Sequence, residues 1–300
     1  MLRVLHITNT YPHFKKMKDG KKVLVPEGFY VHSQFKSLRK YTKAEVYFIN
    51  GYYNKFNYLK AIWYVFLLNF SRESKYDVIH AHYGISGFIA RFQLRYKLVI
   101  SFCGSDVLGT PTASGGKSFL GKMVVLMSKL AHKFCDASIT KTEEMAAILK
   151  EPQCDVIPNG VDFDNFRPLD RNLCRYMAGF DSDKKIILFL GNEHSLRKRY
   201  DLAKDSVNML NERTKKAILY KGYGVHHSQI PVLMNASNVL LVTSDWEGSI
   251  NIVKEAMACN LPIVSVDVGD VKKIIESTEG CYISKRDKLD ISDKLTRSLD

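Results

Sequence analysis

The sequence predicts an α/β protein made of two parallel-sheet domains. Short apolar, β-branched runs alternate with longer segments that suit helices, which is the pattern of strands joined by helical crossovers. The alternation runs through the first half of the chain, pauses in a turn-rich stretch at 165–183, and then resumes. A chain of 300 residues with 46% hydrophobic side chains is long enough for about two such domains, each with its own core.

The first domain is expected at 1–168. Its strands are predicted where apolar runs end in polar or glycine residues, at 4–7, 44–49, 77–82, 97–101, 136–140 and 155–162. The last of these runs continues into an Asn-Gly turn. Helices are predicted at 28–41, at 58–70 and after residue 140 through 150.

A linker is expected at 169–184, and the second domain at 185–300. The second series of strands is predicted at 185–191, 217–220, 238–243 and 262–270. Helices are predicted from about residue 200 and at 252–258.

Two glutamates of the second domain lie on a predicted strand-to-helix turn. Glu247 follows the buried-type run 238–243, and Glu255 lies within the helix 252–258. In an open parallel sheet, ligands bind at the carboxyl ends of the strands, and the N–H groups of a helix start attract phosphate. The two carboxylates can therefore reach different parts of one long ligand. Two unrelated surface glutamates would show the same spacing, so the spacing alone leaves both interpretations open.

A cluster of three cations follows the first strand of the second domain. Arg197, Lys198 and Arg199 lie in the loop after 185–191. Cations at a strand end suit an anionic ligand such as a phosphate group, and a solvated charge cluster is the alternative.

The motifs of several other protein classes are absent or incomplete. No G-x-G-x-x-G follows the first strand, which argues against a nicotinamide enzyme. The run 115–118 ends like a P-loop, but Pro111 stands where the first glycine is required. His80 and His82 lie two residues apart without a third ligand nearby in sequence, so we expect no metal site. The six cysteines form no C-x-x-C pair, as in proteins of a reducing compartment.

The net charge of +13 is concentrated in the first half of the chain. Through Pro168 there are 24 Lys and Arg against 13 Asp and Glu, whereas the remainder has 20 against 18. This asymmetry predicts a partner of opposite charge, namely nucleic acid, anionic lipid or a phosphorylated acceptor, although a gain in solubility also explains it. The aromatic-rich helix 58–70, with basic residues near both ends, suits a membrane surface. Core packing is the alternative for its apolar side chains.

A spanning helix is not expected. The longest apolar run, 61–70, has ten residues, and a bilayer needs about 20. The first residues are too few and too mixed for a signal peptide. We therefore expect a cytoplasmic protein that is peripheral on the inner membrane face.

Four sequence motifs occur in the order typical of one enzyme family. They are DVIPNGVDFDNFRP at 155–168, EGS at 247–249 with EAMA at 255–258, LPIVSVDVGD at 261–270, and Gly104-Ser105-Asp106 in the first domain. With these motifs the chain resembles the retaining glycosyltransferases of family four, particularly the bacterial polysaccharide and cell-wall branch. The resemblance covers nearly the whole chain and implies the GT-B fold, in which two Rossmann-like domains face a cleft.

The resemblance also implies the roles of individual residues. Glu255 is expected to hydrogen-bond the ribose hydroxyls of a nucleotide-sugar donor, and Glu247 to contact the transferred sugar. Lys198 is expected to stabilise the leaving diphosphate, where negative charge develops. The remaining donor-binding residues are expected to be Gly248, Ser249, Ile250, Asn251, Arg197, Asn192 and Gly222. The acceptor side is expected to include Tyr11, Gly28, Gly104, Ser105 and Asp106.

The implied reaction retains the anomeric configuration and needs no metal or other cofactor, since the nucleotide sugar is a co-substrate. The expected acceptor is a lipid-linked or polysaccharide molecule, the expected surface is an anionic membrane, and no nucleic acid is expected to bind. Two alternatives remain: a nucleotide-sugar epimerase of the same fold, and a basic protein that binds nucleic acid or another anionic polymer.

The chain departs from the family pattern at four places. Cys103 stands where the family often has a histidine, so no catalytic base is assigned there. Asn192 replaces a frequent arginine, for which Arg197 or Arg199 is a substitute. Ile250 replaces a common proline at the helix start. The sequence ends at Asp300, several tens of residues before the usual family end, so the last helix that packs on the first domain is expected to be missing.

Overall fold

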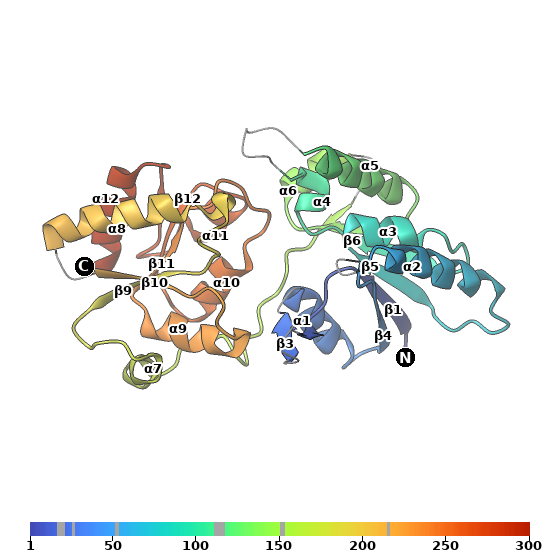
Figure 1. The fold of residues 1–300 in the computed structure, drawn as a ribbon, viewed down its shortest axis with the longest axis horizontal. Coiled ribbons are helices and arrows are strands. Elements are labelled where there is room, and N and C mark those ends of the chain that lie inside the picture. The colour runs from blue at the N-terminus through green and yellow to red at the C-terminus, as the bar shows by residue number, and fades with distance from the viewer. Residues whose placement is uncertain (17–21, 26–27, 52–53, 111–117, 151–153, 215–216) are drawn as a thin grey trace. The chain divides into compact units, whose positions relative to one another are not determined.

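The computed structural model describes residues 1–16, 22–25, 28–51, 54–110, 118–150, 154–214 and 217–300. The chain divides into two compact units, Met1–Asn159 and Gly160–Asp300. Each unit contains a parallel sheet covered by helices (Figure 1). The P-loop-like run 115–118 lies outside the described residues except for Ser118, whose hydroxyl accepts from the Gly121 N–H at the start of a helix.

The first unit is built on a six-stranded parallel sheet with the order β4-β1-β5-β6-β7-β8. The strands are β1 (Arg3–Thr8), β4 (Lys43–Phe48), β5 (Val78–His82), β6 (Lys97–Ser101), β7 (Ala137–Thr140) and β8 (Asp155–Val156). A separate antiparallel pair consists of β2 (His13–Lys16) and β3 (Lys22–Val25). The helices are α1 (Phe29–Leu38), α2 (Phe56–Leu67), α3 (Gly84–Ala90), α4 (Ser105–Leu108), α5 (Phe119–Lys133) and α6 (Glu143–Leu149), with a 3-10 turn at Leu68–Phe70.

Helices cover both faces of this first sheet. On one face, Phe35 of α1 meets His6 of β1 edge-on, with ring centroids 5.6 Å apart. On the other, Tyr64 of α2 stacks on Tyr47 of β4 at 4.4 Å. Tyr47 is the register partner of Ile7, whose side chain points away from that of His6 because successive strand residues alternate. The helix α3 contacts both α2 and α5, which places these three helices on the Ile7 face.

The second unit is built on a five-stranded parallel sheet with the order β10-β9-β11-β12-β13. The strands are β9 (Lys185–Phe189), β10 (Ala217–Lys221), β11 (Val239–Val242), β12 (Ile263–Val266) and β13 (Tyr282–Ser284). The helices are α7 (Arg171–Ala178), α8 (Tyr200–Thr214), α9 (Ile230–Ala236), α10 (Asn251–Ala258), α11 (Val271–Ile275) and α12 (Lys288–Leu299), with 3-10 turns at Leu196–Lys198 and His227–Gln229. Strands β9 and β11 are buried almost throughout, which explains their continuous apolar runs.

The predicted strands form as parallel strands, but several boundaries differ. The predicted strand 155–162 pairs only at Asp155–Val156, and 262–270 only at Ile263–Val266. The stretch 169–184 is not an extended linker, because it contains α7. Asp170 caps this helix by accepting from the Leu173 N–H at 2.7 Å, and Gly179 ends it in a left-handed conformation. Local patterns did not predict several elements, among them α3, α5, α9, β13 and α12.

Among the described residues, no helix has the length and apolar character needed to cross a membrane.

Candidate active site

The candidate donor site lies at the carboxyl edge of the second sheet. Strands β9 and β11 are parallel neighbours, so the loops that follow them lie side by side. Backbone and side-chain hydrogen bonds tie the two loops together. The Asp245 N–H donates to the Arg197 carbonyl at 2.9 Å, and the Thr243 hydroxyl lies 2.9 Å from the carbonyls of both Lys198 and Arg199. The cation loop is therefore anchored to the end of β11.

The structure brings Glu247 together with two of the predicted cations. Lys198 Nζ lies 2.7 Å from Glu247 Oε1, and Arg197 forms an ion pair with the same carboxylate oxygen. Glu247 and Lys198 are both mostly buried, with side chains 14% and 17% exposed. Burial alone would raise the pKa of Glu247, but the charges of Lys198 and Arg197 outweigh it and lower the pKa below its ordinary value. The Glu247 carboxylate is therefore ionised at neutral pH.

The Arg197 side chain is held by more than this ion pair. Its guanidinium lies over the Trp246 ring, 4.9 Å from the ring centroid, and also lies 3.4 Å from the Trp246 carbonyl. Arg199 is engaged elsewhere, because its guanidinium binds Asp201 at 2.9 Å and Asp245 at 3.3 Å. Arg197 is therefore better placed than Arg199 to substitute for a family arginine.

Glu255 lies on α10 in a different environment from Glu247. Its carboxylate is largely buried, and burial raises its pKa to about 7, against a smaller opposing effect of Lys254. His227 Nε2 lies 4.0 Å from Glu255 Oε1, and burial lowers the pKa of His227 and so favours its neutral form. The two glutamates thus differ as ligands: Glu247 is firmly ionised, whereas Glu255 carries a proton about half of the time at pH 7.

The start of α10 contributes main-chain groups to the same edge. The helix begins at Asn251, with Ile250 as the extended N-cap residue, and the positive end of its dipole lies beside Glu247 and Gly248. The loop before α11 supports this turn, because a Cβ on Gly269 would lie 1.9 Å from the Gly248 carbonyl oxygen. Gly269 also has φ +58°, so this position requires glycine twice over.

Three predicted donor residues have structural contacts of their own. The Asn192 amide oxygen accepts from the His194 N–H at 2.9 Å and so shapes its own loop. The Gly222 N–H donates to the Phe189 carbonyl, and a Cβ there would lie 2.4 Å from a Leu190 methyl group. Ser249 accepts from Lys254 Nζ at 2.9 Å. The donor roles of these residues stay predictions.

The acceptor-side residues all fall in the first unit, in two groups. A Cβ on Gly28 would lie 2.5 Å from the backbone of Thr10, so the turn before α1 packs closely on the stretch that contains Tyr11. The Tyr11 hydroxyl lies 2.9 Å from His32 Nδ1. The second group is the loop 103–106, where the Ser105 hydroxyl lies 3.1 Å from that of Tyr83.

Asp106 organises this second group from within. Its fully buried carboxylate accepts from the N–H groups of Gly84, Cys103 and Gly104 at 2.8 to 3.2 Å. Burial raises its pKa, and these hydrogen bonds oppose the rise. Asp106 therefore acts as a clamp between two strand ends, and a direct contact with an acceptor stays a prediction.

Sequence reasoning missed several residues around both sites. In the first unit, the buried Tyr30 hydroxyl lies 3.3 Å from that of Thr10 and also bonds the Cys103 side chain, which links the two acceptor-side groups. In the second unit, His227 approaches Glu255, and Arg286 donates to the carbonyls of Asp245 and Asp267. None of these residues belongs to a recognisable motif, so only the folded chain reveals them.

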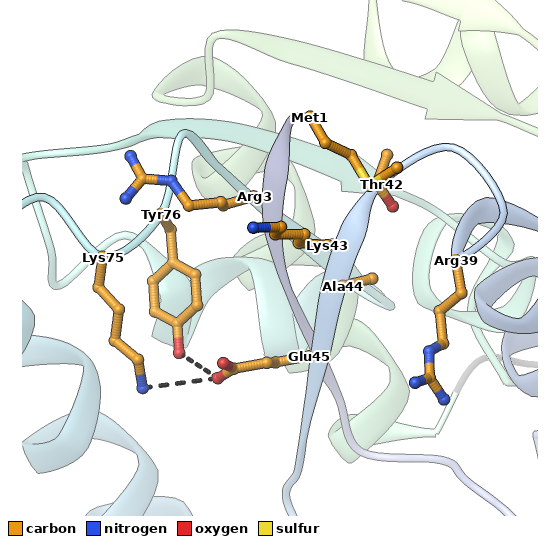
Figure 2. Close-up of a pocket in the computed structure, with 9 residues that line it drawn as sticks. All are labelled: Met1, Arg3, Arg39, Thr42, Lys43, Ala44, Glu45, Lys75 and Tyr76. Atoms are coloured by element: carbon orange, nitrogen blue, oxygen red, sulfur yellow. Dashed lines mark hydrogen bonds and ion pairs between the residues drawn. The ribbon is translucent and has the colours of Figure 1, made fainter.

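A basic pocket of about 470 Å³ lies elsewhere in the first unit (Figure 2). Its lining residues come from the amino ends of β1 and β4 and from the segment before β5. Glu45 accepts from the Tyr76 hydroxyl at 2.7 Å and pairs with Lys75 at 3.5 Å. No predicted site residue lines this pocket, and the ends of the strands where ligands bind in such sheets are the opposite ones.

Comparison with solved structures defines the fold class. Sucrose-phosphate synthase from Thermosynechococcus elongatus matches with a TM-score of 0.75 at 15% identity, over 100% of this chain and 90% of that one. Anabaena Alr3699/HepE in complex with UDP-glucose matches with a TM-score of 0.66 at 14% identity, over 99% and 89% of the two chains. Together with the two parallel-sheet units, these matches show a GT-B fold.

Comparison of the sequence with protein-family profiles identifies the family. The profile of Glycosyltransferase Family 4 matches residues 6–165, and that of Glycosyl transferases group 1 matches residues 198–300. The chain therefore belongs to glycosyltransferase family 4.

Its curated relatives are distant. One is a D-inositol 3-phosphate glycosyltransferase of Mycolicibacterium smegmatis, 23% identical over 75% of this chain and 60% of the relative. Another is an uncharacterized 41.2 kDa protein in the cps region of Klebsiella pneumoniae, 24% identical over 67% of this chain and 63% of the relative. The chain thus spans about three fifths of the length of the curated relatives it matches.

Proposed function

We propose that this protein transfers a sugar, with retention of the anomeric configuration, from a nucleotide-diphosphate sugar to a lipid-linked or polysaccharide acceptor. The observation that carries the proposal is the cluster of Glu247, Lys198 and Arg197 beside the start of α10, with Glu255 further along the same helix. A diphosphate needs cations and main-chain donors, and a sugar and a ribose need hydroxyl acceptors. The cluster and α10 supply both at one edge of the second sheet.

Each charged residue has a distinct role in this reaction. Glu255 accepts hydrogen bonds from the ribose hydroxyls, and Glu247 accepts from the transferred sugar. The bond between the anomeric carbon and the diphosphate oxygen breaks, and Lys198 and Arg197 stabilise the charge that develops on that oxygen. The acceptor hydroxyl attacks from the same face, and its proton passes to the departing phosphate. Cations and the helix start supply the electrostatic stabilisation, so the transfer step is proposed to need no metal.

The ion pairs of Glu247 bear on how the donor binds. Lys198 and Arg197 share one carboxylate oxygen in the free protein. A diphosphate attracts the same cations more strongly, so donor binding is expected to draw them toward the phosphates. Glu247 is then released to accept from the sugar hydroxyls, which couples diphosphate binding to sugar recognition.

Binding and transfer are tested separately with the purified chain. Thermal shift with a panel of nucleotide sugars, beginning with UDP-glucose, is expected to show stabilisation by one of them. Glu255→Ala is expected to weaken donor binding, whereas Lys198→Ala mainly slows transfer. Asp293→Ala, at an exposed ion pair with Arg213, is the control variant and leaves both unchanged. Equal activity of the wild type and both site variants contradicts the proposal, and conversion of the donor without an acceptor indicates an epimerase.

The acceptor is proposed to be reached at an anionic membrane surface, on the cytoplasmic side. Aromatic and aliphatic side chains of α2 and the turn after it form an exposed stripe at helical spacing, although Ala61 and Val65 of the same helix pack into the core. The stripe consists of Phe56, Leu59, Trp63, Phe66, Leu67 and Phe70, of which Phe56 and Phe70 are 69% exposed. The core-packing interpretation therefore applies to one face of this helix, and the exposed stripe on its other face supports the proposed membrane contact.

A second stripe of exposed apolar side chains lies on α5 and the residue that follows it. It consists of Phe119, Leu120, Met123, Leu126, Leu130 and Phe134, all exposed. Neither α2 nor α5 contains an acidic residue, and exposed lysines flank both stripes at 55, 60, 122, 129 and 133. Apolar stripes bordered by lysines match the interface of an anionic bilayer, which attracts the lysines and accepts the apolar side chains. All six cysteines are free, which supports a reducing compartment.

Vesicle binding tests this surface. The wild type is expected to co-sediment with vesicles of anionic phospholipid at low salt. The bound fraction is expected to fall as the salt concentration rises. The double variant Trp63→Ser, Phe70→Ser is expected to abolish vesicle binding. The control is the double variant Tyr176→Ser, Met177→Ser, which changes two exposed apolar residues of α7 and is expected to leave vesicle binding unchanged. Equal loss of vesicle binding in both double variants, or no vesicle binding by the wild type, contradicts the membrane proposal. Neither result bears on the proposed transfer reaction.

A further inference from the structure

Three buried histidines meet inside the first unit, and none of them is assigned to the reaction. His80 and His82 lie two apart on β5, so their side chains share one face of the sheet. His6 of β1 is the register partner of His80 and points to the same face. The third ligand that the local sequence of β5 does not offer thus comes from a strand more than 70 residues earlier.

The ring nitrogens of these histidines converge. His6 Nδ1 lies 3.0 Å from His82 Nε2, and one nitrogen from each of the three rings falls within 4.8 Å of the others. Around a tetrahedral ion with bonds of about 2.0–2.1 Å, ligand nitrogens are about 3.3 Å apart. The rings must therefore rotate from these positions to place all three nitrogens around one ion.

The chemical state of the rings also fits. Burial lowers the pKa of His6 to about 4 and that of His80 to about 3, and it lowers that of His82 as well, so all three imidazoles are neutral at pH 7. Neutral imidazole is the form that binds a metal ion. His80 Nε2 is oriented by the Ser101 hydroxyl at 2.8 Å, and the buried His6 Nε2 has no hydrogen-bond partner in the described part of the chain.

From this convergence we propose that His6, His80 and His82 bind a divalent transition-metal ion, with zinc as the best match, and that the ion fastens β1 to β5. Two imidazoles spaced i, i+2 on one strand and a third on its neighbour supply three ligands to a tetrahedral ion, and a water molecule completes the set. The site goes beyond the proposed transfer reaction and has no part in it.

One nearby charge opposes the ion. The largely buried Lys141 lies close enough to contribute to the lowered pKa values of His80 and His82. The same repulsion acts on a divalent cation at the three rings. Removing this charge with Lys141→Met is therefore expected to tighten metal binding, which a non-specific site on the surface would not show.

The test uses the full chain, freed of metal with a chelator and titrated with Zn²⁺ by calorimetry and with Co²⁺ by visible absorption. We expect one equivalent of Zn²⁺, a raised Tm, and a Co²⁺ d–d spectrum of tetrahedral nitrogen ligation without a thiolate band. His6→Gln and His82→Gln are expected to weaken binding by more than the about 10–100-fold typical of losing an outer-shell partner.

The matched control is His132→Gln, which changes a buried histidine of α5 outside the cluster and is expected to bind Zn²⁺ like the wild type. Equal binding by wild type and His6→Gln overturns the proposal, as does a thiolate band or an unchanged affinity in Lys141→Met. If the cluster variants fail to fold, the wild-type Co²⁺ spectrum decides, since the absence of a tetrahedral nitrogen spectrum also overturns it.

Discussion

Lowering the pH from about 8 to about 5.5 is expected to weaken donor binding about 30-fold, because Glu255 must be ionised to accept from the ribose hydroxyls. Its pKa in the free protein is about 7, raised by burial. Hydroxyl donors favour the carboxylate, so donor binding lowers this pKa and releases a proton. Affinity is therefore nearly full at about pH 8, is about half of that at about pH 7, and falls further as the pH decreases.

The magnitude follows from the ionised fraction of Glu255. With a pKa of about 7, the carboxylate is about 3% ionised at pH 5.5 and about 90% ionised at pH 8, which corresponds to about 2 kcal/mol of binding free energy. The assay is calorimetric titration with the nucleotide sugar that the thermal-shift panel selects. Repeating it in buffers of different ionisation enthalpy counts the protons released.

Two variants isolate the responsible group. Glu255→Gln keeps the size of the side chain and is expected to bind weakly but with little dependence on pH in this range. His227→Gln removes the neighbouring titratable group, whose pKa is lowered by burial, and is expected to keep the wild-type pH dependence. The reasoning is refuted if wild-type affinity is equal at both pH values, or if Glu255→Gln shows the same 30-fold loss.

Two further predictions concern the loops that hold the donor site. Gly269→Ala is expected to destabilise the second unit by at least about 2 kcal/mol in urea unfolding, because its Cβ would clash with the Gly248 carbonyl and the φ of +58° is strained. The control is Gly280→Ala, where φ is +74° but no atom lies within 3.6 Å of the added Cβ. It is expected to lower the free energy of unfolding by only about 1 kcal/mol. Equal losses of stability in the two variants would contradict the clash at Gly269. Thr243→Val removes the buried hydroxyl that donates to the carbonyls of Lys198 and Arg199, and it is expected to lower kcat/KM about tenfold and to cost about 1–3 kcal/mol of stability. Unchanged kinetics would show that the cation loop needs no such anchor.

Local sequence patterns were sufficient for most of the fold. The runs around Leu188 and Leu240 are apolar throughout because both faces of a parallel sheet are covered, and such runs are readable without a structure. Sequence patterns failed where a segment had few apolar residues at helical or strand spacing. The helix α7 follows Pro168 in a polar stretch and was predicted as part of a linker, although Asp170 and Gly179 are its caps.

The site was predictable in its parts. Glu247 and Lys198 were both placed at strand ends, and the carboxyl ends of neighbouring parallel strands always meet at one edge. The sequence did not reveal that the two side chains form an ion pair across 49 residues, nor that Arg197 joins them while Arg199 does not. Side-chain partners depend on rotamers and loop anchors such as Thr243, which no spacing rule contains.

The sequence by itself determined the α/β class, the two series of parallel strands, and the family, because these depend on periodicity and on motifs that are contiguous in the chain. The tertiary structure decided which distant groups meet. It gave Glu255 a burial that raises its pKa, and it brought His6 to His80 and His82. Electrostatics and ligand geometry depend on distances in space, and those are fixed only when strands far apart in sequence pair.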